Sequence, residues 1–118
     1  MSKVLIVDDS RTSRKILKGI LVSAGHEVVG EAVDGQDGVD KYKELSPDIV
    51  TLDITMPVLD GLESLKAIKA ADPNAKVIMV TAAGQQNKMV EAIKLGAAEF
   101  VTKPFEPDVI LAMVDKVS

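Results

Sequence analysis

Val4-Leu5-Ile6-Val7-Asp8-Asp9 is the first of four short apolar runs that end on polar residues. The other three are Ile49-Val50-Thr51-Leu52-Asp53, Val77-Ile78-Met79-Val80-Thr81 and Phe100-Val101-Thr102-Lys103. Short apolar runs rich in β-branched residues are typical of buried parallel strands. In an open parallel sheet, the ligand crevice lies beyond the carboxyl ends of the strands. We therefore expect the polar ends of all four runs to gather at one edge of one sheet.

Segments with the apolar spacing of amphipathic helices alternate with these runs, and a further strand is expected at about Glu27–Ala32. Ser10 and Asp60 are suited to cap helices, and Pro107 to a first helical turn. Strand, helix and parallel strand repeated in this way give a doubly wound α/β sheet with helices on both faces. Helices are expected from Ser10 to Gly25, from Asp34-Gly35 to Ser46-Pro47, from Asp60 to Asp72-Pro73, from about Gln85 to Leu95, and from about Pro107 onward.

Five parallel strands suit the flavodoxin-like order 2-1-3-4-5. In that order the first strand lies between the second and the third, so Asp8-Asp9 and Asp53 become neighbours. Thr81 and Lys103 then extend the site to one side. The whole chain, residues 1–118, has the length of one domain.

The apolar stripes of the helices also predict which residues face the sheet. Such a stripe covers one side of a helix at a spacing of three and four residues. The residues expected to face inward are Ile16, Leu17, Ile20 and Leu21 in the first helix, and Met89, Ala92 and Ile93 in the fourth.

The composition argues against several classes of function. A formal net charge of -4, without a basic cluster, argues against direct nucleic-acid binding. The chain has no cysteine, which removes disulfides, thiolate catalysis and cysteine zinc sites, and the single histidine, His26, cannot form a histidine metal cluster. No apolar stretch approaches the length of a membrane span, and the first residues do not form a signal peptide. We therefore expect a cytoplasmic protein.

The polar residues at the strand ends suit a cation and a phosphoryl group. Asp8, Asp9 and Asp53 would repel one another without a counter-cation, and Mg²⁺ prefers oxygen ligands of this kind. Lys103 and the Thr81 hydroxyl could hold oxygens of a transferring phosphoryl group. A carboxylate can itself be the nucleophile and form an aspartyl-phosphate. Each residue alone could be a cap, a turn residue or a solvated charge, but their joint placement favours a site.

Four ordered segments around these residues resemble the receiver domain of two-component response regulators. They are Leu5-Ile6-Val7-Asp8-Asp9-Ser10, the run from Leu52 to Gly61, Val80-Thr81-Ala82 and Thr102-Lys103-Pro104-Phe105. The resemblance covers essentially the whole chain and is closest to the single-domain chemotaxis regulators. It implies a phosphorylation-dependent signalling switch, in which Asp53 accepts a phosphoryl group from a phosphohistidine of a sensor histidine kinase.

The resemblance also implies roles for the residues around Asp53. Thr81 and Lys103 would contact the bound phosphoryl oxygens. Phe100 matches the switch aromatic of the family, where chemotaxis members usually carry tyrosine. Without a hydroxyl it lacks that hydrogen bond, and an ordinary core phenylalanine stays an alternative. The ligands of Mg²⁺ would be Asp8, Asp9, Asp53 and the main-chain oxygen of Thr55.

The signal is expected to leave through protein contact. The predicted output face comprises the fourth helix, the fifth strand and the fifth helix, with the flagellar motor switch as one candidate target and a phosphatase as a further partner class. Kinase choice is expected to depend on exposed residues of the first helix, Arg11, Thr12 and Arg14. The residues of the output face include Gln86, Lys88, Met89, Lys94 and Phe100.

Other functions remain as alternatives or are disfavoured by particular residues. The chain could be a receiver domain excised from a longer DNA-binding response regulator, or a phosphorelay intermediate. Haloacid-dehalogenase-type phosphatases place a second aspartate two residues after the nucleophile, where this chain has Thr55, so turnover of outside substrates is not expected. A flavodoxin-type flavin site is disfavoured by Asp8-Asp9 and by an aromatic content of only 3%.

Overall fold

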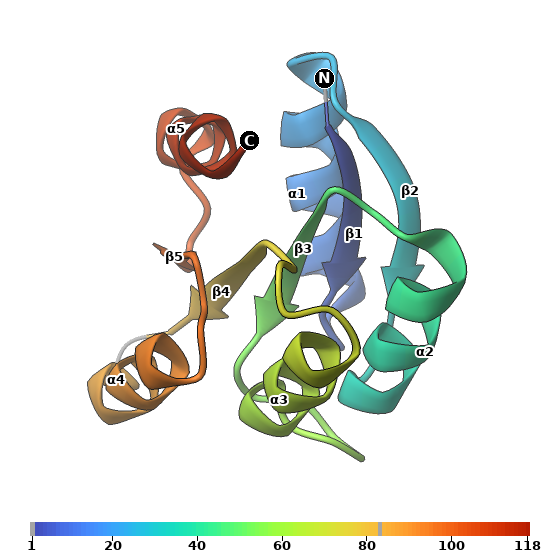
Figure 1. Ribbon diagram of the computed structural model, residues 1–118. Helices are drawn as coiled ribbons and strands as arrows, with labels where there is room; N and C mark the ends of the chain where they lie inside the picture. Colours follow the sequence, from blue (N-terminus) through green and yellow to red (C-terminus); the bar gives the residue numbers. More distant parts are fainter. Residues whose placement is uncertain (1, 83) are drawn as a thin grey trace.

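The computed structural model describes residues 2–82 and 84–118, in which strands and helices alternate (Figure 1). The strands are β1 (Lys3–Val7), β2 (Glu27–Ala32), β3 (Ile49–Asp53), β4 (Val77–Thr81) and β5 (Glu99–Thr102). The helices are α1 (Arg11–Ser23), α2 (Gly35–Leu45), α3 (Gly61–Ala71), α4 (Gln86–Lys94) and α5 (Pro107–Val117). All strands are parallel and pair in the order β2-β1-β3-β4-β5, which confirms the predicted topology.

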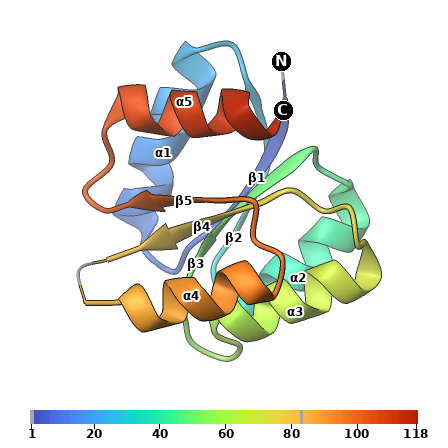
Figure 2. The same cartoon turned by 60° about the vertical axis from the view of Figure 1, so that its left-hand side comes forward.

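The sheet lies between two helical layers, with α1 and α5 on one side and α2, α3 and α4 on the other (Figure 2). Alternate strand residues point to opposite faces, so Leu5 and Val7 of β1 belong to the apolar cluster with α2, α3 and α4, whereas Val4 and Ile6 belong to the one with α1 and α5. The same alternation holds in β4. Because both faces are covered, β3 and β4 are buried along their whole length and are mostly apolar, which is the pattern expected of buried parallel strands.

The register brings the carboxyl ends of the central strands to one level. Val7 pairs with Leu52, Asp53 pairs with Val80, and Thr81 pairs with Thr102. The residues that follow these positions therefore emerge at the same edge of the sheet. This confirms the arrangement that the apolar runs predict.

The starts of α1 and α3 follow local capping chemistry. The Ser10 hydroxyl accepts a hydrogen bond from the Ser13 backbone N–H at 3.2 Å, and the Asp60 carboxylate accepts one from the Glu63 N–H at 2.9 Å. Both caps were predicted, and Pro107 does occupy the first turn of α5. None of the helices in the described residues is long and apolar enough to cross a membrane.

The prediction that Ile16 and Ile93 face inward is wrong. Ile16 is 50% exposed and Ile93 is 58% exposed. Consecutive helix residues point about 100° apart, so a narrow contact face cannot bury both members of an adjacent pair. In each helix the neighbour is buried instead, Leu17 in α1 and Ala92 in α4.

Candidate phosphoacceptor site

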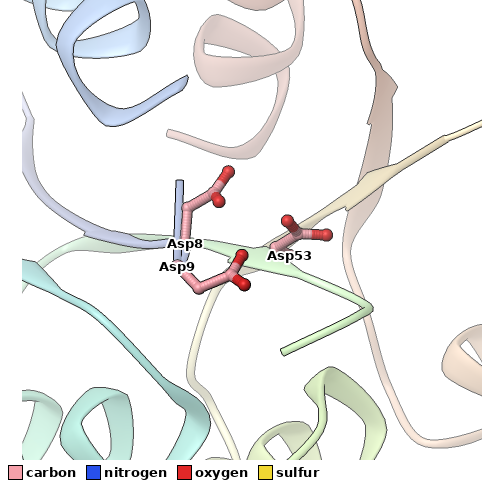
Figure 3. A group of neighbouring side chains, drawn as sticks. All are labelled: Asp8, Asp9 and Asp53. Atoms are coloured by element: carbon pink, nitrogen blue, oxygen red, sulfur yellow. The ribbon is translucent and has the colours of Figure 1, made fainter. Parts of the chain in front are cut away.

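Three carboxylates lie together where β1 and β3 end (Figure 3). Asp8 and Asp9 follow β1, Asp53 is the last residue of β3, and one carboxylate oxygen of each lies within 4.8 Å of the others. Asp8 is 3% exposed and Asp53 is 7% exposed, whereas Asp9 is open to solvent. Two nearly buried carboxylates at this separation need a neighbouring positive charge.

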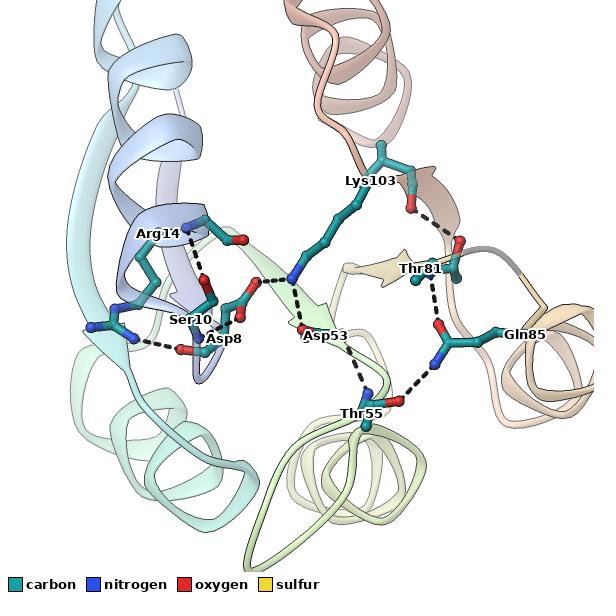
Figure 4. A network of polar contacts seen from close by, with 11 residues as sticks. Asp8, Ser10, Arg14, Asp53, Thr55, Thr81, Gln85 and Lys103 are labelled. Carbon is teal, nitrogen blue, oxygen red and sulfur yellow. Dashed lines mark hydrogen bonds and ion pairs between the residues drawn. The ribbon is translucent and has the colours of Figure 1, made fainter.

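Lys103 provides that charge (Figure 4). Its ammonium Nζ lies 3.0 Å from Asp8 Oδ2 and 3.1 Å from Asp53 Oδ2. Lys103 follows β5, and its backbone N–H donates to the Thr81 carbonyl at 2.8 Å. The peptide bond from Lys103 to Pro104 is cis. The lysine side chain thus reaches back across the sheet edge and contacts both buried carboxylates.

Asp53 and Lys103 both have shifted pKa values, and each contributes to the shift of the other. Burial and the negative charge of Asp8 raise the pKa of Asp53 above its ordinary value, although the bonds from Lys103 and the Thr55 N–H oppose the rise. Burial lowers the pKa of Lys103, but its hydrogen bonds to Asp8 and Asp53 outweigh this, so the net pKa is raised. Lys103 is therefore fully protonated at neutral pH.

Asp8 is held in place by its own loop and by α1. Its Oδ1 accepts a hydrogen bond from the Ser10 N–H at 2.8 Å, and its carbonyl accepts one from Arg14 Nη1 at 2.7 Å. Arg14 also pairs with Glu31 at 3.2 Å, and its side chain is only 12% exposed. The prediction that Arg14 is exposed is therefore wrong: its guanidinium holds the Asp8 carbonyl and Glu31.

Asp53 is positioned by the loop that links β3 to α3. Its Oδ1 accepts a hydrogen bond from the Thr55 N–H at 3.3 Å, and the Gly61 N–H donates to the Ile54 carbonyl at 2.7 Å. A Cβ atom at Gly61 would overlap the Asp53 carbonyl oxygen. Glycine is thus required where α3 begins, because the helix packs directly on the backbone that carries the carboxylate.

Thr81 and Phe100 lie on the β4–β5 side of the site. The Thr81 side chain is buried, and its hydroxyl donates to the Val101 carbonyl at 3.4 Å, away from Asp53. Phe100 is half-buried and packs against the core layer that lies under α3 and α4. The structure therefore places both residues on the expected strands. In this arrangement the threonine hydroxyl does not face the carboxylates.

Sequence reasoning missed Gln85, which precedes α4. Its side-chain Oε1 accepts a hydrogen bond from the Ala82 N–H at 2.7 Å, and its Nε2 donates to Thr55 Oγ1 at 2.6 Å (Figure 4). No local sequence signal could have identified it, because a glutamine before a helix is ordinary. Only the packing of the loops after β3 and β4 brings its two partners within reach.

The donor set suits a hard divalent cation. Asp8, Asp9 and Asp53 offer only carboxylate oxygens. Mg²⁺ and Ca²⁺ prefer oxygen ligands of this type, whereas softer metals prefer nitrogen or sulfur ligands. Lys103 neutralises only part of the charge of the three carboxylates. The residues present therefore fit a cation site that opens to solvent at Asp9.

Comparison with known proteins agrees with this geometry. Residues 4–115 match the family model described as the response regulator receiver domain. The chemotaxis protein CheY of Thermotoga maritima is 53% identical over 98% of this chain and 97% of its own length. CheY of Bacillus subtilis is 50% identical over 97% of this chain and 95% of its own.

A solved structure extends the comparison to the fold. The CheX–CheY–BeF₃–Mg²⁺ complex from Borrelia burgdorferi contains a chain that is 42% identical to this one, with a TM-score of 0.93 over 98% of this chain and 87% of that one. The sequence match, the strand order and the acidic cluster at the sheet edge all agree with a receiver domain. The chain therefore belongs to the response regulator receiver family, as a CheY-like phosphoacceptor domain rather than an enzyme that turns over outside substrates.

Proposed function

We propose that this chain, as one receiver domain over residues 1–118, takes a phosphoryl group onto Asp53 from a phosphohistidine of a sensor histidine kinase. The observation that supports this most directly is the Lys103 ammonium, shared between Asp8 and Asp53 at the sheet edge. Asp8 and Asp53 are nearly buried, and burial of charged groups costs free energy. A site that holds a charged ligand accounts for this cost, whereas a simple surface ion pair does not.

In the transfer, an Asp53 carboxylate oxygen attacks the phosphorus atom. A new P–O bond forms, the P–N bond to the donor imidazole breaks, and its electron pair leaves with the imidazole. Lys103 and Thr81 hold oxygens of the phosphoryl group, the lysine by charge and the threonine by its hydroxyl. This work is mostly positioning and charge stabilisation, as phosphoryl transfer requires.

We assign the cation site to Mg²⁺. Asp8 and Asp53 are fixed by the hydrogen bonds already described, and Asp9 is the donor most open to exchange with solvent. When bound, Mg²⁺ supplies positive charge that offsets the phosphoryl oxygens and the carboxylates. The proposed ligands are Asp8, Asp9, Asp53 and the main-chain oxygen of Thr55.

The switch step follows from the position of Thr81. Its hydroxyl is bonded to Val101 and must turn toward Asp53 to contact a phosphoryl group. Such a move pulls on the loop that leads into α4. We propose that Phe100, half-buried on the neighbouring strand, then changes its exposure as the switch aromatic.

The output face that we propose is formed by α4, β5 and α5. Lys94 is exposed there, and Val90 and Ile93 are 55% and 58% exposed beside it. A mixture of exposed apolar and charged side chains suits a transient partner. The gain in partner affinity on phosphorylation should be modest, because coupling free energies are typically about 1–3 kcal/mol.

We propose a cytoplasmic chemotaxis role, with the flagellar motor switch as one candidate target and a phosphatase as a further partner. The identity to CheY proteins over nearly their whole length supports this role. A receiver domain excised from a longer DNA-binding regulator and a phosphorelay intermediate remain the alternatives.

A phosphotransfer assay tests the proposal. A histidine kinase labelled with radioactive phosphate should lose label as this chain gains it, and Asp53→Asn should gain none.

A binding assay with the target tests the output face. Charge reversal by Lys94→Glu should leave labelling of Asp53 intact but weaken binding to the target, whereas the matched control Lys43→Glu on α2 should leave binding unchanged. Loss of binding only in the α2 variant would move the output face elsewhere.

A further inference from the structure

Gln85 joins the two loops on either side of the phosphoacceptor. Thr55 lies two residues after Asp53, and Ala82 directly follows Thr81. The Gln85 side chain contacts both, at 2.6 Å to Thr55 Oγ1 and 2.7 Å to the Ala82 N–H. One side chain therefore connects the loop that carries Asp53 to the loop that begins at Thr81. We call this pair of contacts the Gln85 bridge.

The chemistry of the partners determines the orientation of the bridge. A backbone N–H can only donate, so the amide oxygen of Gln85 must face Ala82. The amide nitrogen then faces the Thr55 hydroxyl, which can accept. Both groups of the amide are thus used, the oxygen by Ala82 and the nitrogen by Thr55.

The bridge is not an ordinary helix cap. Gln85 occupies the N-cap position of α4, yet its side chain makes no capping hydrogen bond to the first turn. The helix start relies on its main chain, since the Lys88 and Met89 N–H groups donate to the Gln85 carbonyl at 3.1 Å. The side chain turns back toward the phosphoacceptor loop instead, so its contacts serve the loops rather than the helix.

The bridge belongs to the arrangement in which Thr81 faces away from Asp53. Ala82 is covalently joined to Thr81, so a shift of Thr81 toward a phosphoryl group carries the Ala82 N–H with it. That shift takes the Ala82 N–H out of the position from which it donates to Gln85 Oε1 here. The bridge therefore stabilises the arrangement in which the Thr81 hydroxyl is bonded to Val101.

We propose that Gln85 is a positioning residue that opposes the movement of Thr81 and Ala82 toward phosphorylated Asp53. The proposal rests on the proposed function of that site. Gln85 thereby helps to set how strongly a phosphoryl group shifts the equilibrium between the two loop arrangements. Removal of the bridge should make the phosphorylated arrangement easier to reach.

Titration with beryllium fluoride, a phosphoryl analogue, in the presence of Mg²⁺ tests this on the intact chain. Gln85→Ala should bind the analogue about three- to tenfold more tightly, the factor expected from one neutral hydrogen bond. Thr55→Val should act in the same direction, because it removes the hydroxyl and keeps the main-chain oxygen. The double variant should gain no more than Gln85→Ala alone, since Gln85→Ala already removes the bond to Thr55.

The neighbouring residue provides a matched control. Gln86 has the same side chain, is exposed and lies on the first turn of α4, so Gln86→Ala should leave the affinity unchanged. Without ligand, the amide NMR signals of α4 in Gln85→Ala should move toward their positions in the wild-type chain with analogue bound. A merely structural role predicts the opposite, because a loosened site binds the analogue more weakly.

The outcomes distinguish failure of the Gln85 role from failure of the proposed function. If the wild-type chain binds beryllium fluoride and Gln85→Ala binds it equally or more weakly, the positioning role is wrong and the proposed function stands. Additive effects of Gln85→Ala and Thr55→Val would also overturn the bridge. If the wild-type chain does not bind the analogue at Asp53, the proposed function fails and the inference fails with it.

Discussion

Replacement of Lys103 by methionine should destabilise the fold through the carboxylates that it leaves behind. Methionine keeps most of the length of the side chain but removes the charge. Asp8 and Asp53 then face each other in a site where their side chains are only 4% and 11% exposed. Removal of one partner of a buried ion pair costs about 3–5 kcal/mol. The lysine side chain itself is 27% exposed, so water can partly replace it, and we expect a loss of about 3 kcal/mol.

Urea unfolding without divalent cations measures this loss. With a slope of about 2 kcal/mol per molar, the midpoint should fall by about 1.5 M in Lys103→Met. Asp53→Asn in the same background should recover part of the loss, because it removes one of the two unpaired charges.

Lys116 is a matched control for the charge itself. It pairs with Glu99 at 2.6 Å, but its side chain is 64% exposed. Exposed pairs contribute about 0–1 kcal/mol, so Lys116→Met should barely move the midpoint. Equal and small losses in both lysine variants would contradict this prediction, because the Lys103 pairs would then be screened like surface pairs.

Three further predictions concern stability, metal binding and signalling. Burial and the 2.8 Å bond to Asp72 raise the pKa of Tyr42 to about 12. Its stabilising contribution is complete below about pH 10 and is lost as the pH rises through the folded pKa, by at most about 2–3 kcal/mol. Tyrosinate absorbance follows this directly, since the chain has one tyrosine and no tryptophan, and Tyr42→Phe should flatten the loss. Asp9→Ala should weaken Mg²⁺ binding in a calorimetric titration, and an unchanged affinity would count against this ligand. Thr81→Ala should still accept phosphate but transmit it poorly, so NMR shifts in α4 as large as those of the wild type would contradict its coupling role.

Much of the fold can be predicted because its signals are local. The apolar runs before Asp8 and Asp53 reveal buried strands, and capping residues such as Ser10 mark helix starts within one turn. The end of each strand then places the chemistry at one edge of a parallel sheet. Local chemistry and topology agree here, so three strand-end carboxylates are enough to locate the site.

The remaining features depend on packing between distant segments. Ile93 has the spacing of a core residue, yet α4 contacts the sheet over too narrow a face to bury it. The sequence around Arg14 suggests an exposed charge. The fold places Glu31 of β2 beside it, and the two side chains form an ion pair. Gln85 gains its role only where two loops meet, and nothing in its neighbours along the chain predicts that contact.

The mass of the intact protein after incubation with Mg²⁺ and a small acyl-phosphate donor tests the central claim most directly. We expect one added phosphate, located on the peptide that contains Asp53. We expect no added phosphate in Asp53→Asn, which lacks the nucleophile, or after removal of Mg²⁺, because the developing charge then lacks its counter-cation. Equal labelling of Asp53→Asn would contradict the account, since the phosphoacceptor would then be another residue.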